Sequence, residues 1–251
     1  MSEVFWLSRA QFERLEPLLP KDTRGVARVD DRRVISGIVH VLMSGSRWAD
    51  APAVYGPRKT LYNRFVRWAK KGVWREAFEA LAAAGGPSAE IMLDSTHAKA
   101  HRCAGGGKGG PLAQAIGRSR GGRTTKVHAV VDGRGRPIAF LITPGQLGDL
   151  RAATALIGPL PPADLCLADC AYDSHGFRSF LAHRGTRAVV PNNRTRKHPY
   201  PFDRQLYRRR NLIERMFSRL KDFRRVATRY DKLAVTYDAA VLIAAMVIWW
   251  L

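Results

Sequence analysis

The sequence is poor in cysteine and in long hydrophobic runs, and each shortage excludes a class of protein. Its 251 residues include only three cysteines, an odd number that argues against a disulfide framework and for a reducing compartment. The most apolar run, AAVLIAAMVIWWL at residues 239–251, is shorter than the roughly 20 residues that a membrane-spanning helix needs. Residues 1–12 show neither the basic nor the apolar segment of a secretion signal. We therefore expect a cytoplasmic protein with no membrane partner.

Acidic residues are the other shortage. The chain has 21 aspartates and glutamates against 42 lysines and arginines, which gives a formal net charge of +21 and an isoelectric point near 10.9. So large a positive excess attracts polyanions, and nucleic acid is the first partner to consider. We therefore expect a DNA-binding protein that is associated with the nucleoid.

Residues 1–88 are expected to form a small all-α domain. Apolar residues recur at helical spacing through residues 8–19, 31–45 and 57–72, and Gly72 is suited to end the third helix. The outward face of that helix is basic, which is typical of helix-turn-helix DNA-binding modules and also of ordinary solvated helices. The DNA contacts predicted on it are Arg64, Arg67, Lys70 and Lys71.

Residues 89–251 are expected to form an α/β domain, because the break GGPS is followed by strand-like segments. Helices are expected near residues 149–157 and 175–183. The expected strands, in chain order, are AEIMLD, TTKVHAVVD, RPIAFLIT, ADLCLAD and RAVVP. Three strands that can pair antiparallel, followed by alternating helices and strands, predict a mixed sheet with flanking helices. This order resembles a ribonuclease-H-like fold.

Three acidic residues are candidates for one site. Asp94 and Asp169 each end an apolar strand, where the side chains of an open sheet meet the ligand crevice. Glu214 is expected on a helix that packs on the same sheet. Converging carboxylates favour hard cations, here two Mg²⁺ or Mn²⁺ ions that serve phosphoryl transfer. All three residues are therefore predicted as catalytic metal ligands.

The surroundings of Glu214 are strongly basic, in the segment YRRRNLIERMFSRLK at residues 207–221. At about 100° per residue, Glu214 shares one helical stripe beside the buried edge with Tyr207, Arg210 and Lys221. A surface ion pair would be the simplest explanation of such a pattern. The alternative, which we favour, is that the acid binds metal while the basic residues bind DNA.

The motifs resemble those of bacterial insertion-sequence transposases of the DDE class, most closely the insertion-sequence-five family. RWADAP, YGPRKTLYNRFVRW and GVW are similar to the family's DNA-binding module. DSTHAKAHR, AIGRSRGGRTTKVHAVVD, TPGQ and LADCAYDS are similar to its catalytic core. YRRRNLIERMFSRLK matches its signature of Tyr, two residues, Arg, three residues, Glu, six residues and Lys.

The resemblance implies roles for these residues. Asp94, Asp169 and Glu214 would be the catalytic triad, with Tyr207, Arg210 and Lys221 supporting DNA or metal geometry. It implies a transposase that cleaves the inverted repeats at transposon ends and transfers the 3′ hydroxyl into target DNA, as a homodimer or higher multimer. Two positions depart from the pattern: Gly148 stands where His is expected, and Cys170 where a basic residue is frequent.

Some residues and functions keep more than one interpretation. His97, Lys99 and Arg102 follow Asp94 and are predicted to contact phosphates, while His97, His101 and Cys103 leave zinc as a minor alternative. A metal-dependent DNA nuclease of the same fold would cleave without strand transfer. A catalytically inactive DNA-binding regulator would bind without cutting.

Overall fold

The computed structural model describes residues 4–21, 28–107 and 109–251. Contacts divide the chain into two compact units. The first, called here the sheet unit, comprises residues 82–99 and 115–219. The second, the helical unit, comprises residues 1–81, 100–114 and 220–251, so it gathers segments from both ends of the sequence. The predicted boundary at residue 88, between a DNA-binding and a catalytic domain, stays a prediction.

The sheet unit is built on a mixed sheet with the strand order β2-β3-β1-β5-β6, in which β4 also pairs with β3. The pairs that β3 forms are antiparallel, whereas β1 with β5 and β5 with β6 are parallel. This arrangement confirms the predicted α/β class. The strands are β1 (Glu90–Ala100), β2 (Gly117–Ser119), β3 (Gly122–Asp132), β4 (Pro137–Pro144), β5 (Leu165–Ala168) and β6 (Arg187–Val189).

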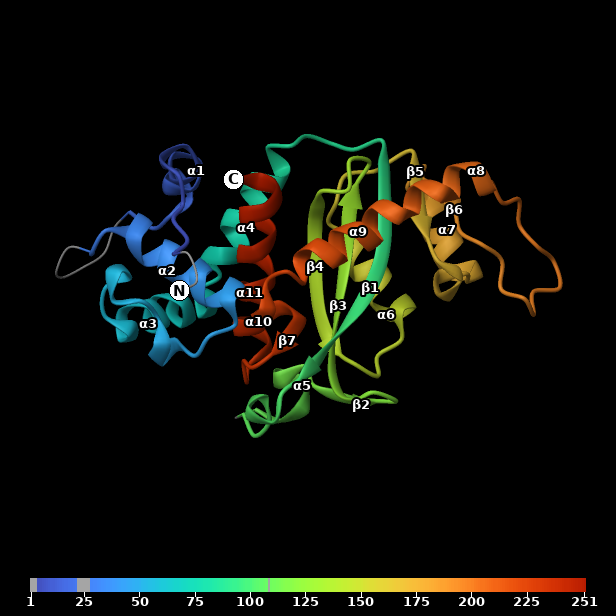
Figure 1. Cartoon of the computed structure of the whole chain (residues 1–251). Helices are drawn as coiled ribbons and strands as arrows, with labels where there is room; N and C mark the ends of the chain where they lie inside the picture. Colours follow the sequence, from blue (N-terminus) through green and yellow to red (C-terminus); the bar gives the residue numbers. More distant parts are fainter. Residues whose placement is uncertain (1–3, 22–27, 108) are drawn as a thin grey trace. The chain divides into compact units, whose positions relative to one another are not determined.

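Helices lie on both sides of this sheet (Figure 1). On one face, α6 (Asp149–Ile157) and α7 (His175–His183) pack on a core that includes Leu93, Val130 and Cys166. Side chains alternate along a strand, so Met92 and Leu167, which are fully buried, point to the opposite face. Helix α9, Asn211–Leu220, crosses that face.

The helix that carries Glu214 is not the single long helix that was expected. It consists of α8 (Arg204–Tyr207), a 3-10 turn (Arg208–Arg210) and then α9. The side chain of Asp203 caps α8 by accepting hydrogen bonds from the amides of Gln205 and Leu206. The tighter turn coincides with two ion pairs that bind successive arginines of the turn to β1.

Strand β1 continues past Asp94, so the expectation that the strand ends there was wrong. It runs to Ala100 because β3 is long enough to pair with it as far as Lys99, which lies opposite Thr124. The parallel pairing with β5, however, ends at Leu93. Asp94 is therefore the first residue beyond the parallel ladder.

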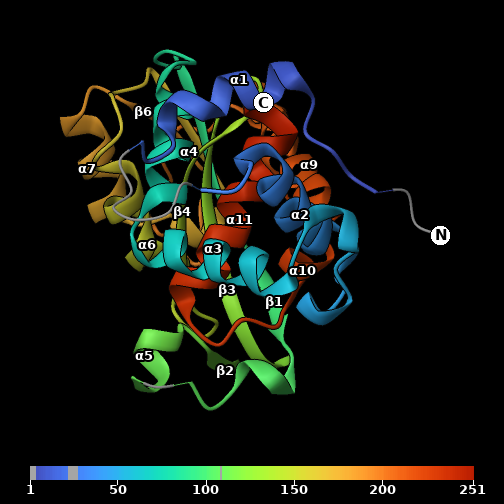
Figure 2. The same ribbon diagram turned by 90° about the vertical axis from the view of Figure 1, so that its left-hand side faces the viewer.

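The helical unit has a core shared by α2, α3, α10 and α11, which contact one another and are seen together in Figure 2. The apolar C-terminal run lies mostly in α11 (Ala234–Ala245), most of whose side chains are buried in this core. Arg75 of α4, a helix that the sequence pattern did not reveal, holds Asp238 of α11 through two hydrogen bonds of 2.8 Å. Over the described ranges, no helix is long and apolar enough to cross a membrane.

The described elements of the helical unit are short. They are α1 (Arg9–Leu15), α2 (Asp31–Ser44), α3 (Arg58–Lys70), α4 (Val73–Ala83), α5 (Gly110–Gln114), α10 (Arg224–Ala227), β7 (Thr228–Arg229) and α11 (Ala234–Ala245) with its terminal π-turn (Met246–Trp250). Helices α3 and α4 are joined by Lys71 and Gly72 alone, and Gly72 has the predicted helix-ending conformation with φ of +79°.

The core beneath α7 gives a test of the fold. Leu181 is completely buried in it, so Leu181→Ala is expected to lower the free energy of unfolding by about 2 to 5 kcal/mol. Chemical denaturation measures this change. His183→Ala, an exposed position on the same helix, is the control and should shift stability by no more than about 0.5 kcal/mol. Equal effects of the two substitutions would contradict the packing.

Candidate functional site

Asp94 and Asp169 directly follow the parallel pairing of β1 with β5, in matching register. Leu93 of β1 is paired with Ala168 of β5, and Asp94 and Asp169 are the next residue of each strand. Parallel neighbours are roughly 4.8 Å apart. By the alternation of side chains, both aspartates point away from the α6 and α7 face and toward the face that α9 crosses. The predicted convergence of these two residues is therefore built into the backbone.

Each aspartate is held by its own local contacts. Asp94 accepts a 2.8 Å hydrogen bond from the amide of Ser95, and Asp169 caps a short 3-10 helix by accepting one of 2.9 Å from the amide of Ala171. Burial raises the pKa of Asp94, and the negative charge of Asp169 raises it further, against the opposing effects of the Ser95 amide and Arg210. The repulsion between the two acids is consistent with their proximity.

Arg210 connects Asp94 to Glu214. Its Nη1 donates to Asp94 Oδ2 at 2.7 Å and its Nη2 donates to Glu214 Oε1 at 2.5 Å. The arginine side chain is only 14% exposed, whereas that of Glu214 is 58% exposed. Glu214 therefore lies farther into solvent than the predicted position beside the buried edge, although the preceding residue, Ile213, is fully buried. One guanidinium thus supplies the positive charge between two of the three predicted ligands.

Tyr207 and Lys221, the other two residues of the predicted helical stripe, have different surroundings. The Arg210 guanidinium carbon lies 5.6 Å from the centre of the Tyr207 ring, so Tyr207 is next to the carboxylates. Burial raises the pKa of Tyr207, although the positive charge of Arg210 opposes this effect. Lys221 follows the last residue of α9, within the helical unit, and burial lowers its pKa.

A second polar cluster lies behind Asp94 and was not predicted. Ser95, the next residue, donates a 2.5 Å hydrogen bond to Asp149 at the start of α6. The ammonium of Lys126 is 3.0 Å from the same carboxylate oxygen and donates to the carbonyl of Leu147 at 2.8 Å. His128 lies directly opposite Ser95 in the sheet. Asp94 and Ser95, two successive residues of β1, therefore take part in polar networks on opposite faces of the sheet.

The charges in this second cluster are fixed by their neighbours. Burial opposes the ionisation of Asp149, but the hydrogen bond from Ser95 and the contact with Lys126 outweigh it, and the pKa of this carboxyl is lowered. Burial lowers the pKa of His128 to about 4, so its imidazole is neutral at pH 7. The signal in the sequence was present: Lys126 and His128 alternate with apolar residues in the middle of the strand TTKVHAVVD.

Six of the ten predicted DNA contacts are exposed, whereas Arg64, Tyr207, Arg210 and Lys221 are partly buried. Arg64 is only 11% exposed, forms an ion pair with Asp31 of α2, and its guanidinium carbon lies 4.7 Å from the centre of the Trp68 ring. Its charge is used to hold α3 against α2, so the geometry does not support the prediction that it contacts DNA. The exposed residues are Arg67, Lys70, Lys71, His97, Lys99 and Arg102.

The structure gives a clear result on metal ligation within the described ranges. No three His, Cys, Asp or Glu side chains there are close enough together to hold a metal ion, and this applies to Asp94, Asp169 and Glu214 as it does to His97, His101 and Cys103. At the carboxylates, Arg210 lies between Asp94 and Glu214. The donor set nevertheless fits a hard divalent cation, because all three groups are carboxylates and two are on adjacent strands.

The sheet order, its flanking helices and the two acids that follow the parallel β1–β5 pairing define a ribonuclease-H-like α/β fold with a preceding helical segment. Comparison with known families is decisive for the class. A family described as "Transposase DDE domain" matches residues 86–250, and one described as "Putative transposase of IS4/5 family (DUF4096)" matches residues 7–78. The chain belongs to the DDE transposase family.

Individual relatives agree with this assignment. A protein of Brucella ovis named "Putative transposase for insertion sequence element IS6501" is 38% identical over 127 residues, which cover 50% of this chain and 98% of the relative. A Burkholderia cepacia protein with the corresponding name for element IS402 is 28% identical over 137 residues, 50% of this chain and 63% of that protein.

A solved structure shows the same fold. The piggyBac transposase synaptic complex with hairpin DNA has a TM-score of 0.52 at 10% sequence identity, covering 98% of this chain and 73% of that chain. At this level of identity the similarity is one of fold alone.

The contact between Arg210 and Asp94 can be tested by a double-mutant cycle. Without divalent cation, Arg210→Met leaves a largely buried carboxylate unpaired, so we expect it to lower the free energy of unfolding by roughly 1 to 3 kcal/mol. Part of this loss should disappear in the background Asp94→Asn, and denaturant titration of all four proteins gives the coupling. Arg209→Met is the matched control, because its ion pair with Glu90 is more exposed and worth about 1 kcal/mol or less. A coupling of zero would contradict the described contact.

Proposed function

We propose that this protein is a DNA transposase that cleaves DNA at transposon ends and transfers the resulting 3′ hydroxyl into target DNA. The observation that carries the proposal is the register of β1 with β5, which sets Asp94 beside Asp169, in a chain of the DDE transposase family. Glu214, held next to Asp94 through Arg210, is the proposed third member.

DNA is the proposed substrate and partner. The net charge of +21 provides long-range attraction to the phosphate backbone, and the exposed basic residues of α3 and β1 provide local contacts. We propose that the helical N-terminal segment, residues 1–88, binds the terminal inverted repeats while residues 89–251 carry the chemistry. Two ends must be held during joining, so the proposed active form is a homodimer or higher multimer.

The proposed cofactor is Mg²⁺ or Mn²⁺, in a pair of ions. Asp94, Asp169 and Glu214 would hold it, and when bound it supplies activation of the attacking oxygen and stabilisation of the leaving oxygen. The side chains of this chain contribute position and charge. Arg210 orients Asp94 and Glu214 by hydrogen bonds, and Tyr207 fixes one side of the guanidinium.

The first test of this proposal is cleavage of a labelled duplex that carries the terminal repeat of the element. Wild-type protein should nick the 3′ end in the presence of Mg²⁺ and not with EDTA. Asp94→Asn, Asp169→Asn and Glu214→Gln should each reduce the rate by at least about 10³-fold. DNA affinity should stay close to that of wild type, because it comes from the basic surface.

Further assays distinguish the proposed transposase from a nuclease and from an inactive DNA-binding regulator. Glu13→Gln removes an exposed acid that pairs with its neighbour Arg9 and should cleave normally. Joining of the cleaved end to a target plasmid distinguishes a transposase from a nuclease of the same fold. Specific binding without cleavage by wild-type protein would instead indicate an inactive regulator, and full activity in the three acid variants would refute the site.

The cluster behind Asp94 predicts a positioning effect. Asp149→Asn weakens the contacts that hold Ser95 and Lys126, so we expect cleavage to slow by about 10- to 100-fold while DNA affinity is unchanged. The dependence of rate on Mg²⁺ concentration should also shift to higher concentration, which a loss of stability alone would not cause. Asp164→Asn, an exposed acid of the same unit, is the control. A normal rate and Mg²⁺ dependence in Asp149→Asn would show that the cluster serves only the fold.

A further inference from the structure

A long irregular segment precedes the helix that carries Glu214. Residues 190–203 connect β6 to α8 and contain neither a regular helix nor a strand. Connections of this length within a compact unit are uncommon, and they are usually either disordered or functional. This one is held in place by an extensive set of side-chain contacts, which argues for the second case.

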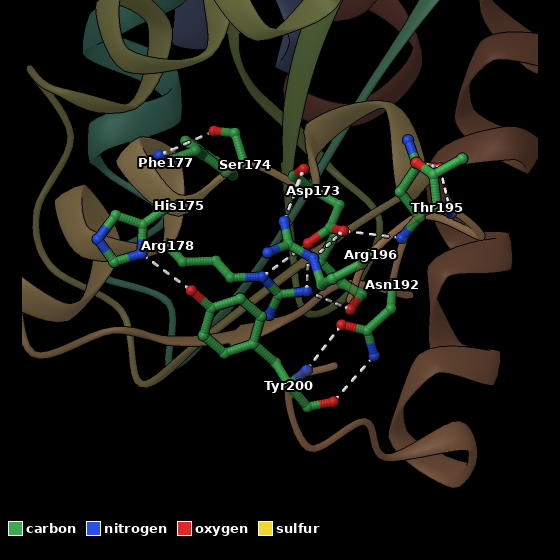
Figure 3. A network of polar contacts seen from close by, with 11 residues as sticks. Asp173, Ser174, His175, Phe177, Arg178, Asn192, Thr195, Arg196 and Tyr200 are labelled. Atoms are coloured by element: carbon green, nitrogen blue, oxygen red, sulfur yellow. Dashed lines mark hydrogen bonds and ion pairs between the residues drawn. The ribbon is translucent and has the colours of Figure 1, made fainter. Parts of the chain in front are cut away.

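Asp173 is the centre of these contacts (Figure 3). Its carboxylate has no exposed surface and accepts hydrogen bonds from Arg178 at 2.9 Å, from Arg196 at 2.7 Å and from the amide of Asn193 at 2.7 Å. Arg178 also donates to the carbonyl of Val190 at 2.8 Å. Burial opposes ionisation of Asp173, but these donors outweigh it and the pKa of the carboxyl is lowered. Asp173 and its partner Arg178 of α7 therefore bind residues near both ends of the segment 190–196.

Tyr200 closes the segment on its other side. Its ring lies against both arginines, with guanidinium carbons 4.4 Å and 4.9 Å from the ring centre for Arg178 and Arg196. Its amide and carbonyl make reciprocal hydrogen bonds with the side chain of Asn192, of 2.8 Å and 2.9 Å. His175 Nδ1 is 2.9 Å from its hydroxyl. Residues 192 and 200 are thus joined, and residues 193–199 form a closed projection, called here the basic tip.

The charges of the basic tip fall into two kinds. Arg196 is used internally, because Asp173 neutralises it. Arg194 and Lys197 are exposed, and within the described part of the chain no carboxylate lies within ion-pair distance of either. The contacts of Asp173, Asn192 and Tyr200 order the backbone that carries Arg194 and Lys197, and the side chains of these two cations are not among those contacts. An exposed pair of cations on a preordered loop is suited to bind phosphate, since the cost of ordering the backbone is already met.

We infer that the basic tip is a preformed contact for the DNA phosphate backbone, with Arg194 and Lys197 as its phosphate ligands and the Asp173 network as its support. The inference rests on the proposed function, because the segment runs directly into α8, Arg210 and Glu214. It adds a surface to the predicted set of DNA contacts, none of which lies in residues 190–203.

The test measures binding of a labelled transposon-end duplex in EDTA, where no cleavage occurs, across a series of salt concentrations. The double variant Arg194→Gln/Lys197→Gln should bind more weakly, and the slope of log affinity against log salt concentration should fall by about two. Arg134→Gln/Arg151→Gln removes two exposed charges from the sheet unit, outside residues 1–88 and the basic tip, and is the matched control, with an unchanged slope expected.

A second variant tests whether the network around Asp173 and Tyr200 orders the basic tip, and it removes no exposed cation. Tyr200→Ala should accelerate hydrogen exchange at the amides of residues 192–200 and weaken DNA binding, while the surface charges remain. If the double variant binds with wild-type affinity and slope, the inference is wrong even though the proposed function stands. If wild-type protein does not bind the duplex at all, the proposed function itself fails.

Discussion

The parallel hydrogen bonding between β1 and β5 is the constraint on which the candidate site depends. It sets Leu93 opposite Ala168 and so brings the residue after each, Asp94 and Asp169, side by side on one face. A shift of one residue would turn every side chain of the strand to the other face, removing Leu93 from the core and Asp94 from Arg210. One register therefore places both the apolar side chains in the core and the two acids on the other face. Burial of the apolar side chains offsets the repulsion between the acids, which is unfavourable by itself.

The same alternation makes β1 a connection between two polar networks. Asp94 faces Arg210 and Glu214, whereas Ser95 faces Asp149, which is paired with Lys126 of β3. The two networks are therefore attached to consecutive residues of one strand, both of which pair with β3. This explains why a carboxylate on α6, far from the others in the sequence, belongs to the description of the site.

Much of this was predictable from the sequence, because local patterns determine it. The α/β class, the hairpin of β3 and β4, the bounds of α6 and α7, and the strand end at Asp169 follow from periodicity and turn residues. The end of β1 did not, since it depends on the length of its partner strand. Arg64 was assigned to the solvent face because helical spacing cannot show that Asp31 of another helix neutralises it. The network of Asp173 and Tyr200 was equally hidden, because its members come from separate segments.

The bridging position of Arg210 has a thermodynamic consequence. One guanidinium neutralises Asp94 and Glu214 at once, so any ion that binds both acids must compete with an attached side chain at high effective concentration. Whatever draws that guanidinium away raises the affinity of the acids for a replacement cation by the same factor, and the reverse also holds. A phosphate is a natural competitor for the arginine. Cation binding at the two acids and anion binding at Arg210 would therefore be coupled.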